Sequence, residues 1–418
     1  MSTLDPFTVA LMGARMHYAV PRILHEQGLL KHFYADICAT VGWPRLLPLI
    51  PSAVLPPGLR RLAARLPSGI PRSLMTAFTC FGLDYQRRRN SACSVSEMTA
   101  VHLWAGETFN RLILETSPPQ NTSLYCFNSA GLELLQAWQA RGDFSVLEQT
   151  IAPRRVEERI LRQEEQAFPG WQAPLPQDTN VDDYMEREEQ EWQAARMIVC
   201  GSEFVREGIR ECGGPVERCV IVPYGIALGD FPGKLRKRIP QRSLRVLTVG
   251  EIGLRKGSHY VLEAARKLAG RVEFRMAGTM GFLPERAAEF CRHIEWVGVV
   301  PRREILAHYQ WADIFLLPSL CEGSATVVYE ALSIGLPVIA TASTGSLIQN
   351  GVSGFCVPEK DPLAIVQAIE VFLSSPNMLE EMSFAAQRRA QEGSIESYSE
   401  RLVAVLRSNA KNGGLKSN

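Results

Sequence analysis

The sequence lacks the paired cysteine spacing that marks a zinc site or a disulfide framework. Its 10 cysteines are scattered along 418 residues, without a C-x-x-C pair and without histidines at ligand spacing. This distribution is typical of free, mostly buried thiols. We therefore expect no metal site and no bound cofactor.

Long apolar runs and a large net charge are also absent. No apolar run approaches the roughly 20 residues needed to span a bilayer, and the first residues lack the basic segment of a signal peptide. The formal net charge of +1 argues against general nucleic-acid binding. These absences lead us to expect a soluble, cytoplasmic protein without a nucleic-acid partner.

A dinucleotide fingerprint is missing as well. No G-x-G-x-x-G follows any strand-like segment, which disfavours a nicotinamide oxidoreductase. A chain of 418 residues that is 46% hydrophobic can nevertheless bury two sizeable cores. This capacity fits two Rossmann-like α/β domains.

The most informative segment runs from Leu316 to Thr341. Its apolar runs predict two buried parallel strands, Ile314–Leu317 and Leu336–Ala340, joined by a helix over Ala325–Ile334. One βαβ crossover is therefore expected here.

Two glutamates, Glu322 and Glu330, stand around the start of this helix. We expect Ser324 to cap the helix, whose free backbone N–H groups would attract an anion such as a phosphate. The eight residues between the glutamates correspond to roughly 12 Å along a helix axis, too far for an acid/base pair on one bond. They could hold opposite ends of an extended ligand such as a nucleotide sugar, with Glu330 on ribose hydroxyls and Glu322 near the sugar. The alternative is two solvated helix glutamates.

A basic loop supplies a second element. The predicted strand Leu244–Val249 leads through Gly250 to Arg255 and Lys256, two adjacent cations just before an amphipathic helix over Ser258–Leu268. On the residues alone, the loop could equally be a solvated basic turn.

These motifs, in this order, resemble those of the retaining GT-B glycosyltransferases of family 4, the glycosyl transferases group 1. The resemblance covers almost the whole chain and is strongest over residues 244–358. It implies that Arg255 and Lys256 clamp the donor diphosphate, and Lys256-Gly257 matches the family's Lys-Gly closely. Many members carry an arginine directly after the glycine that matches Gly250, whereas this chain has Glu251 there.

The resemblance also implies the donor contacts. Gly278 ends a predicted strand where the family's chain passes close to the donor, and the backbone over residues 298–300 is expected to border a base, which the sequence does not identify as uracil, guanine or adenine. The implied donor site comprises Gly250, Arg255, Lys256, Gly278, Val299, Val300, Glu322, Gly323, Ser324, Ala325, Thr326 and Glu330. Within it, Glu322, Arg255 and Lys256 are the implied catalytic residues.

The amino-terminal half resembles the family less closely. Gly13, Arg15 and His17 follow a predicted first strand and are candidates for contacts to acceptor or donor across a central cleft. Glu148 and Gln149 stand on the inner strand where many relatives present a histidine near the anomeric carbon. This departure suggests a different acceptor arrangement, unless Glu148 only pairs with an arginine.

We expect the chain to divide into four parts. Residues 1–225 form an acceptor-side domain, 226–243 a linker, 244–395 a nucleotide-sugar domain, and 396–418 a helix and tail that cross back to the first domain. Residues 156–191, dense in Glu and Arg, are predicted to be a mostly exposed helical excursion.

Residues 43–90 form a basic and apolar insertion. This region carries eight arginines against one acid, Asp84, interleaved with leucines. Relatives use such a region to rest on anionic lipid, so we expect a peripheral membrane surface there. The alternative is an arginine-rich solvated surface packed by leucines.

The function implied by the resemblance is retaining, metal-independent hexosyl transfer. The donor would be a nucleotide-diphosphate sugar and the acceptor a glycan or lipid-linked glycan, in polysaccharide or lipopolysaccharide biosynthesis. Two alternatives remain: an inactive GT-B scaffold protein, and a nucleotide-sugar epimerase that isomerises the sugar without transferring it.

Overall fold

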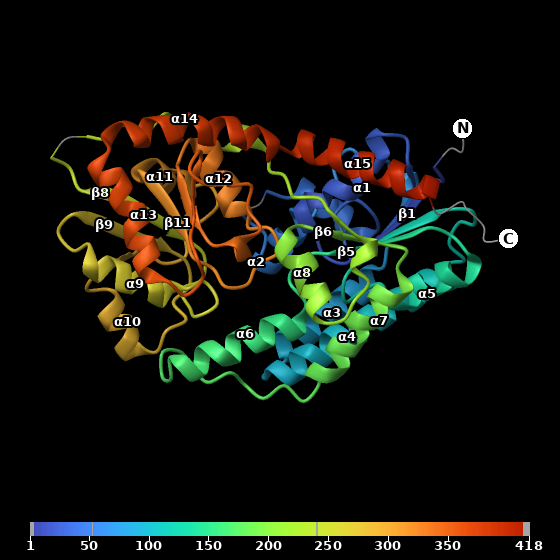
Figure 1. Ribbon diagram of the computed structural model, residues 1–418. Helices are drawn as coiled ribbons and strands as arrows, with labels where there is room; N and C mark the ends of the chain where they lie inside the picture. The colour runs from blue at the N-terminus through green and yellow to red at the C-terminus, as the bar shows by residue number, and fades with distance from the viewer. Residues whose placement is uncertain (1–3, 52, 240, 413–418) are drawn as a thin grey trace.

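Two parallel β-sheets organise the chain, which the computed structural model describes over residues 4–51, 53–239 and 241–412 (Figure 1). The first sheet has seven strands in the order β3-β2-β1-β4-β5-β6-β7, and the second has six in the order β10-β9-β8-β11-β12-β13. All pairs within both sheets are parallel. The predicted class of two doubly wound α/β sheets is confirmed.

The elements of the first sheet and its surroundings span the amino-terminal half. The strands are β1 (Phe7–Leu11), β2 (Leu30–Ala35), β3 (Met75–Ala77), β4 (Ser123–Phe127), β5 (Ser145–Gln149), β6 (Met197–Cys200) and β7 (Cys219–Ile221). The α-helices are α1 (Ala19–Glu26), α2 (Pro57–Ala63), α3 (Thr79–Ser91), α4 (Val95–Glu115), α5 (Leu132–Arg141), α6 (Arg154–Ala167), α7 (Val181–Ala194) and α8 (Glu203–Glu211). Short 3-10 helices are η1 (Arg15–Tyr18), η2 (Trp43–Leu49), η3 (Arg72–Leu74), η4 (Val216–Arg218) and η5 (Leu228–Asp230).

The second sheet and the remaining helices follow. The strands are β8 (Leu244–Val249), β9 (Val272–Ala277), β10 (Glu295–Trp296), β11 (Ile314–Leu317), β12 (Val338–Ala340) and β13 (Gly354–Cys356). The helices are α9 (Ser258–Lys267), α10 (Pro284–Phe290), α11 (Ile305–Trp311), α12 (Thr326–Ile334), η6 (Ala342–Thr344), α13 (Pro362–Ser374), α14 (Pro376–Glu392) and α15 (Ile395–Asn412).

Each sheet has an apolar core on both of its faces. Along β11, Ile314 and Leu316 belong to one buried cluster, whereas Phe315 and Leu317 belong to another. Successive side chains of a strand point to opposite faces, so a strand covered on both faces is apolar throughout. This is why a continuous apolar run was enough to predict β11.

The chain order reverses at the first strand of each sheet. β1 lies between β2 and β4, and β8 lies between β9 and β11. Open parallel sheets bind ligands beyond the carboxyl ends of the strands at such reversal points. The loops after β1, β4, β8 and β11 are therefore the places to search for a site.

The segment over residues 156–191 is helical and most of its residues are exposed or partly exposed, as predicted, but its few buried positions pack into the two domains. α6 leaves the first sheet and packs against the apolar core of the second, below α9 in Figure 1. Its Glu164 is 1% exposed and accepts hydrogen bonds from His259 at 3.0 Å and Tyr260 at 2.8 Å, with Lys360 Nζ at 2.7 Å. Burial alone would raise the pKa of Glu164, but these hydrogen bonds hold it below its ordinary value.

α7 also buries charge, in the first domain. Glu188 accepts hydrogen bonds from Gln149 Nε2 at 2.7 Å and the Arg154 backbone at 2.8 Å, and Glu191 accepts from the backbone N–H groups of Ser129 and Gly131. Burial raises the pKa of both carboxyl groups to about 7. The hydrogen bonds therefore offset only part of the cost of burying these two carboxylates in their charged form.

The carboxyl-terminal helix crosses in the opposite direction. α15 continues from α14 along one side of the molecule and lies against the first domain (Figure 1), where Tyr398, Leu402 and Leu406 join the core that contains β1. The helix is tied by Arg401, whose guanidinium donates to the backbone oxygen of Pro223 at 2.9 Å.

In the part of the chain that the structure describes, no single helix is both long and apolar enough to cross a bilayer. One pair, residues 362–374 and 377–392, reaches that length and composition only together and is bent by 110°.

The buried acids of α7 predict a pH-dependent stability. Between pH 4.5 and about 7 the folded protein retains protons on Glu188 and Glu191 that the unfolded chain has lost. The contribution of these two groups to stability is therefore fully present below pH 4.5 and is lost as the pH rises through about 7. Each carboxyl is expected to contribute on the order of 1–3 kcal/mol. Denaturant unfolding of Glu188→Gln from pH 5 to 8 should show a flatter pH profile than the unsubstituted protein. The exposed Glu186→Gln serves as the control, and equal slopes for all three proteins would contradict the account.

Candidate functional site

The loop Ser319–Ala325, between β11 and α12, lies at the carboxyl edge of the second sheet. Leu320 N donates to the backbone oxygen of Arg255 at 2.9 Å, and Ala325 N donates to that of Thr344 at 2.9 Å. The loops after β8 and β12 thus hold it from both sides. Its middle residue, Glu322, is fixed beside the basic loop.

The three residues named as catalytic lie together. Lys256 Nζ is 2.5 Å from Glu322 Oε1, and the nearest guanidinium nitrogen of Arg255 is 3.7 Å from Glu322 Oε2. Arg255 also donates to the backbone oxygen of Cys321 at 3.0 Å. Two cations against one carboxylate leave one net positive charge, and the Lys256 and Glu322 side chains are only 12% and 11% exposed. Such a cluster favours the binding of an additional anion.

The start of α12 differs from the prediction. The helix begins at Thr326 with Ala325 as its N-cap, and no side chain caps it. Ser324 is not the cap because its hydroxyl lies 2.6 Å from the Tyr329 hydroxyl instead. Val328 N donates to the Ala325 oxygen at 3.0 Å, which leaves the first-turn N–H groups of Thr326 and Val327 able to donate to an anion beside the basic loop.

Glu330 lies one turn into α12 and is 3% exposed. It accepts a hydrogen bond from the Tyr309 hydroxyl at 2.8 Å and forms an ion pair with Arg302. Glu322 is only 8% exposed, so the alternative of two solvated glutamates is wrong. Tyr309 and Arg302 were missed by the sequence analysis, since nothing in their local pattern connects them to α12.

Glycines bring the loops after β8, β9 and β10 into contact. Gly250 N donates to the Ala277 oxygen at 2.9 Å, and Gly278 N donates to the Gly298 oxygen at 2.8 Å. A Cβ atom on Gly278 would lie 1.7 Å from the Gly250 oxygen, so no other residue fits there. Beyond this contact, Val299 is 74% exposed and Val300 is partly buried. All these predicted donor residues line the same edge of the sheet.

The loop after β1 faces this edge from the first domain. Arg15 donates to the Thr150 hydroxyl at 2.7 Å, and Gly13 N donates to Asp36 at 3.1 Å. His17 follows with an exposed side chain and a left-handed backbone, φ 51°. Gly13 and Arg15 are thus connected to the junction, whereas the His17 side chain makes no hydrogen bond or ion pair with any residue that the structure describes.

The prediction that Glu148 or Gln149 contacts the acceptor is wrong, because both side chains are buried. Glu148 is 1% exposed and accepts a hydrogen bond from Tyr125 at 2.5 Å, while Gln149 is fully buried and donates to Glu188. Glu148 therefore pairs with tyrosine rather than with an arginine, and burial raises its pKa. β5 is covered on both faces, so its side chains cannot reach a ligand; Thr150, just past its end, can.

The two domains meet at Gly323. Ser202, which caps α8, donates its hydroxyl hydrogen to the Gly323 oxygen at 2.6 Å. A Cβ atom on Gly323 would lie 2.1 Å from the Thr150 oxygen. The loop that carries Glu322 is therefore in direct contact with the carboxyl edge of the first sheet.

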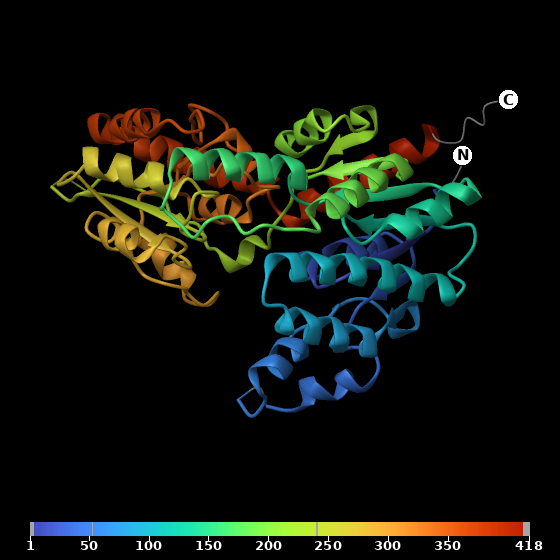
Figure 2. The same ribbon diagram turned by 90° about the horizontal axis from the view of Figure 1, so that it is seen from below.

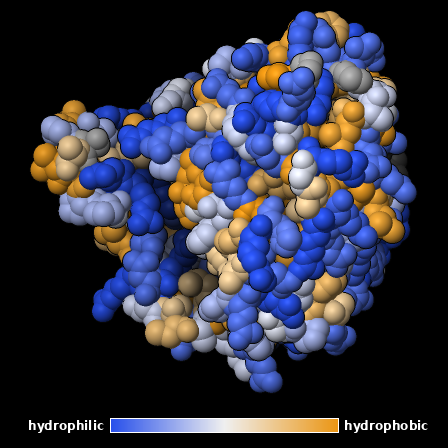
Figure 3. Space-filling view, turned by 90° about the vertical axis from the view of Figure 1, so that its left-hand side faces the viewer, coloured by the Kyte–Doolittle hydropathy of each residue, from blue (hydrophilic) through white to orange (hydrophobic). Residues whose placement is uncertain are grey.

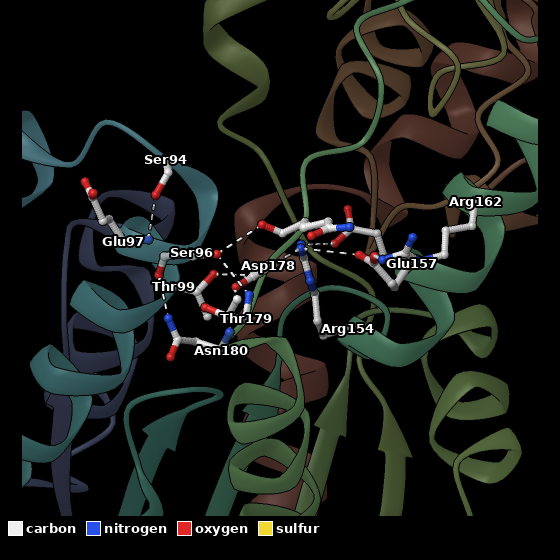
Figure 4. A network of polar contacts seen from close by, with 12 residues as sticks. Ser94, Ser96, Glu97, Thr99, Arg154, Glu157, Arg162, Asp178, Thr179 and Asn180 are labelled. Atoms are coloured by element: carbon white, nitrogen blue, oxygen red, sulfur yellow. Dashed lines mark hydrogen bonds and ion pairs between the residues drawn. The ribbon is translucent and has the colours of Figure 1, made fainter.

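A cavity of about 210 Å³ lies beside this contact in the first domain. It is lined by Thr99, His102, Ile151, Ala152, Arg154, Glu157, Tyr184 and Glu188. Figure 4 shows its wall, where Thr99 of α4 donates to Asp178 at 2.7 Å and Arg154 of α6 pairs with Glu157 at 3.2 Å. Burial and the charges of Arg89 and Arg154 lower the pKa of His102, so its imidazole is neutral at pH 7. The sequence analysis missed this cavity because its residues come from three distant segments.

Comparison with known proteins finds a family match in the second half of the chain. Residues 234–389 match the family described as glycosyl transferases group 1. The matched residues make up just over a third of the chain, and this part of the chain is similar to that family. The resemblance inferred from the sequence motifs is thereby confirmed, and the matched region contains Arg255, Lys256, Glu322 and Glu330.

This chain is similar to two curated relatives over part of its length. It is 33% identical over 171 residues to the amylovoran biosynthesis glycosyltransferase AmsK of Erwinia amylovora, covering 37% of this chain and 41% of the relative. It is 29% identical over 242 residues to a D-inositol 3-phosphate glycosyltransferase of Geodermatophilus obscurus, covering 51% and 52%. The chain thus matches about half the length of these relatives.

The structural comparison concerns the fold. The Anabaena protein HepE, solved in complex with UDP and glucose, superposes with a TM-score of 0.57 at 13% identity, covering 97% of this chain and 100% of that one. At such low identity the likeness shows the fold alone. It confirms the GT-B arrangement over nearly the whole chain.

The contact at Gly323 generates a prediction about how the domains are held. Gly323→Ala would force the added methyl group against the Thr150 oxygen, which should destabilise the contact by roughly 1–3 kcal/mol. A larger radius of gyration in small-angle scattering and a lower melting temperature are expected. Gly229→Ala, whose Cβ would meet nothing within 4 Å, should change neither. An unaltered radius and melting temperature in Gly323→Ala would refute the contact.

Proposed function

We propose that this protein is a retaining hexosyltransferase that moves a sugar from a nucleotide-diphosphate donor to a glycan or lipid-linked acceptor, in surface polysaccharide or lipopolysaccharide biosynthesis. The observation that carries the proposal is the meeting of Arg255, Lys256, Glu322 and the uncapped start of α12 at the reversal point of the second sheet. Support for the donor class comes from HepE, which was solved with UDP-glucose. Support for the process comes from AmsK, named for amylovoran biosynthesis.

The donor is proposed to lie along the edge formed by the loops after β8, β9, β10 and β11. Its diphosphate would contact Arg255, Lys256 and the first-turn N–H groups of α12, which together supply two positive charges and a helix N-terminus. The base would border the exposed Val299. Ribose hydroxyls would donate to Glu330 in place of Arg302, whose side chain is 62% exposed and so free to withdraw.

The reaction needs charge stabilisation more than a base. The acceptor oxygen forms a bond to the anomeric carbon on the face from which the diphosphate departs, and the bond from that carbon to the phosphate oxygen breaks through an oxocarbenium-like transition state. The acceptor's hydroxyl proton passes to the departing phosphate oxygen. Arg255 and Lys256 stabilise the charge that builds on the diphosphate, while Glu322 holds sugar hydroxyls.

The acceptor is proposed to approach from the first domain. Arg15 and Thr150 stand at the contact with Gly323, and the cavity beside them has room for a sugar ring and a neutral imidazole, His102, that can accept a hydroxyl hydrogen bond. Glu148 and Gln149 take no part, because both side chains are buried.

A donor panel with matched variants tests the proposal. Thermal shift and product formation would be measured with UDP-, GDP- and ADP-sugars and an oligosaccharide lipid extract as acceptor. One donor should stabilise the protein. Arg255→Ala/Lys256→Ala should slow transfer by roughly 10²- to 10⁴-fold, because two charge-assisted contacts of about 1.5–3 kcal/mol each are lost. Lys267→Ala, at an exposed position at the end of α9, should behave like the unsubstituted protein.

Three other outcomes would decide between the alternatives. Donor binding without transfer to any acceptor would favour the inactive scaffold. Conversion of the donor sugar to its epimer, with the nucleotide still attached, would favour the epimerase. Failure of every nucleotide sugar to bind would overturn the donor site itself.

A further inference from the structure

The chain between α6 and α7, residues 168–180, contacts the basic loop of the second domain although it comes from the first half of the sequence. We name it the return segment, because it leads back from the far end of α6 toward the first domain (Figure 2). Gln172 Oε1 accepts a hydrogen bond from the backbone N–H of Leu254 at 3.2 Å. Leu254 directly precedes Arg255 and Lys256. A side chain of the return segment is thus bonded to the loop that carries both cations.

Backbone contacts hold Gln172 in this place. Gln172 forms an isolated antiparallel bridge with Phe282, in the stretch that follows β9. The same stretch is joined to the basic loop, because Gly281 N donates to the Ile252 oxygen at 2.7 Å. The return segment, the stretch after β9 and the basic loop are therefore connected in series, and this connection fixes where the Gln172 side chain begins.

Aromatic rings anchor the return segment on the second domain. The ring centroids of Phe168 and Trp171 lie 4.3 and 5.7 Å from that of His259, in the first turn of α9, and Trp171 lies 5.3 Å from Phe282. At the end of the molecule toward which α6 runs, hydrophobic residues lie in small groups among hydrophilic ones (Figure 3). Such a surface suits solvent, so these rings serve packing within the molecule rather than an outside partner.

The other end of the return segment is tied to α4 of the first domain (Figure 4). Thr99 Oγ1 donates to Asp178 at 2.7 Å, and Asn180 Nδ2 donates to the Ser96 oxygen at 2.9 Å. Thr99 also lines the cavity of about 210 Å³ beside the contact at Gly323. The return segment therefore connects the wall of this cavity with the basic loop.

The bond from Gln172 matters because the N–H group that it satisfies is buried. Leu254 is 1% exposed, and a buried N–H that loses its acceptor costs more than the bond itself contributes. The preceding N–H, that of Gly253, is held in the same way by Ser258 Oγ at 3.1 Å. Without the Gln172 oxygen, the backbone directly before the two cations would turn to find another acceptor, and the cations would move with it.

We propose that Gln172 is a positioning residue for donor binding: its amide oxygen sets the orientation of the loop from which Arg255 and Lys256 contact the diphosphate. Gln172 acts through the Leu254 N–H and does not touch the donor. This inference rests on the proposed function and adds to the donor site a residue that lies outside the matched region 234–389.

Gln172→Met in the full chain tests the inference. Gln172 is partly exposed, so this substitution removes the acceptor without emptying the core. UDP, GDP and ADP would each be titrated by calorimetry, and for the nucleotide that binds we expect the dissociation constant to rise roughly tenfold. In transfer assays the donor KM should rise while the acceptor KM stays unchanged. Gln172→Glu keeps an acceptor oxygen at the same length and should restore most of the affinity.

A matched control and a second readout accompany this test. Gln177→Met changes an exposed glutamine of the same return segment and should bind nucleotide as tightly as the unsubstituted protein. Hydrogen–deuterium exchange reports on the loop without any nucleotide. The peptide over residues 250–257 should exchange faster in Gln172→Met than in Gln177→Met or the unsubstituted protein.

Three results would overturn the inference. Unchanged exchange over residues 250–257 in Gln172→Met would mean that the loop does not depend on this bond. A lower melting temperature with unchanged nucleotide affinity would leave Gln172 a structural role only. Failure of UDP, GDP and ADP to bind the unsubstituted protein would overturn the proposed donor site and the inference with it, so the two failures are distinguishable.

Discussion

The approach of Gly323 to the Thr150 backbone is the contact on which the arrangement of the site depends. It exists because residue 323 has no side chain and because the Ser202 hydroxyl reaches the Gly323 oxygen at 2.6 Å. Glu322 directly precedes Gly323, so the same contact holds its carboxylate, which pairs with Lys256 and Arg255, close to where the two domains meet. The reversal points of the two sheets are thereby brought to one junction.

Two helices that cross in opposite directions reinforce this junction. α6 comes from the first half of the chain and buries Val156 and Ile160 in the core of the second sheet, while α15 comes from the second half and buries Tyr398 and Leu402 in the core of the first. Each fully buried apolar side chain contributes about 1.5–3 kcal/mol. The domains are therefore coupled at a distance from the site, and any closing movement must preserve both contacts.

Features that depend on residues close together in the chain, or on neighbouring strands, could be predicted from the sequence. The strand Ile314–Leu317 was predicted from its apolar run, and the meeting of Lys256 with Glu322 follows once β8 and β11 are neighbours in a parallel sheet. Prediction failed where tertiary contacts decide. Ser324 bonds Tyr329 instead of capping α12, and both faces of β5 are covered, which hides Glu148 and Gln149. No local pattern connects Arg302 or Tyr309 with Glu330.

We expect a diphosphate to neutralise the net positive charge of the cluster formed by Arg255, Lys256 and Glu322. A crystal structure with a bound nucleoside diphosphate tests this expectation most directly. We expect the phosphates within hydrogen-bonding distance of Lys256 and the first-turn N–H groups of α12, with Glu330 on the ribose and Arg302 displaced. A nucleotide bound elsewhere, with the Lys256–Glu322 pair and the start of α12 untouched, would contradict the account.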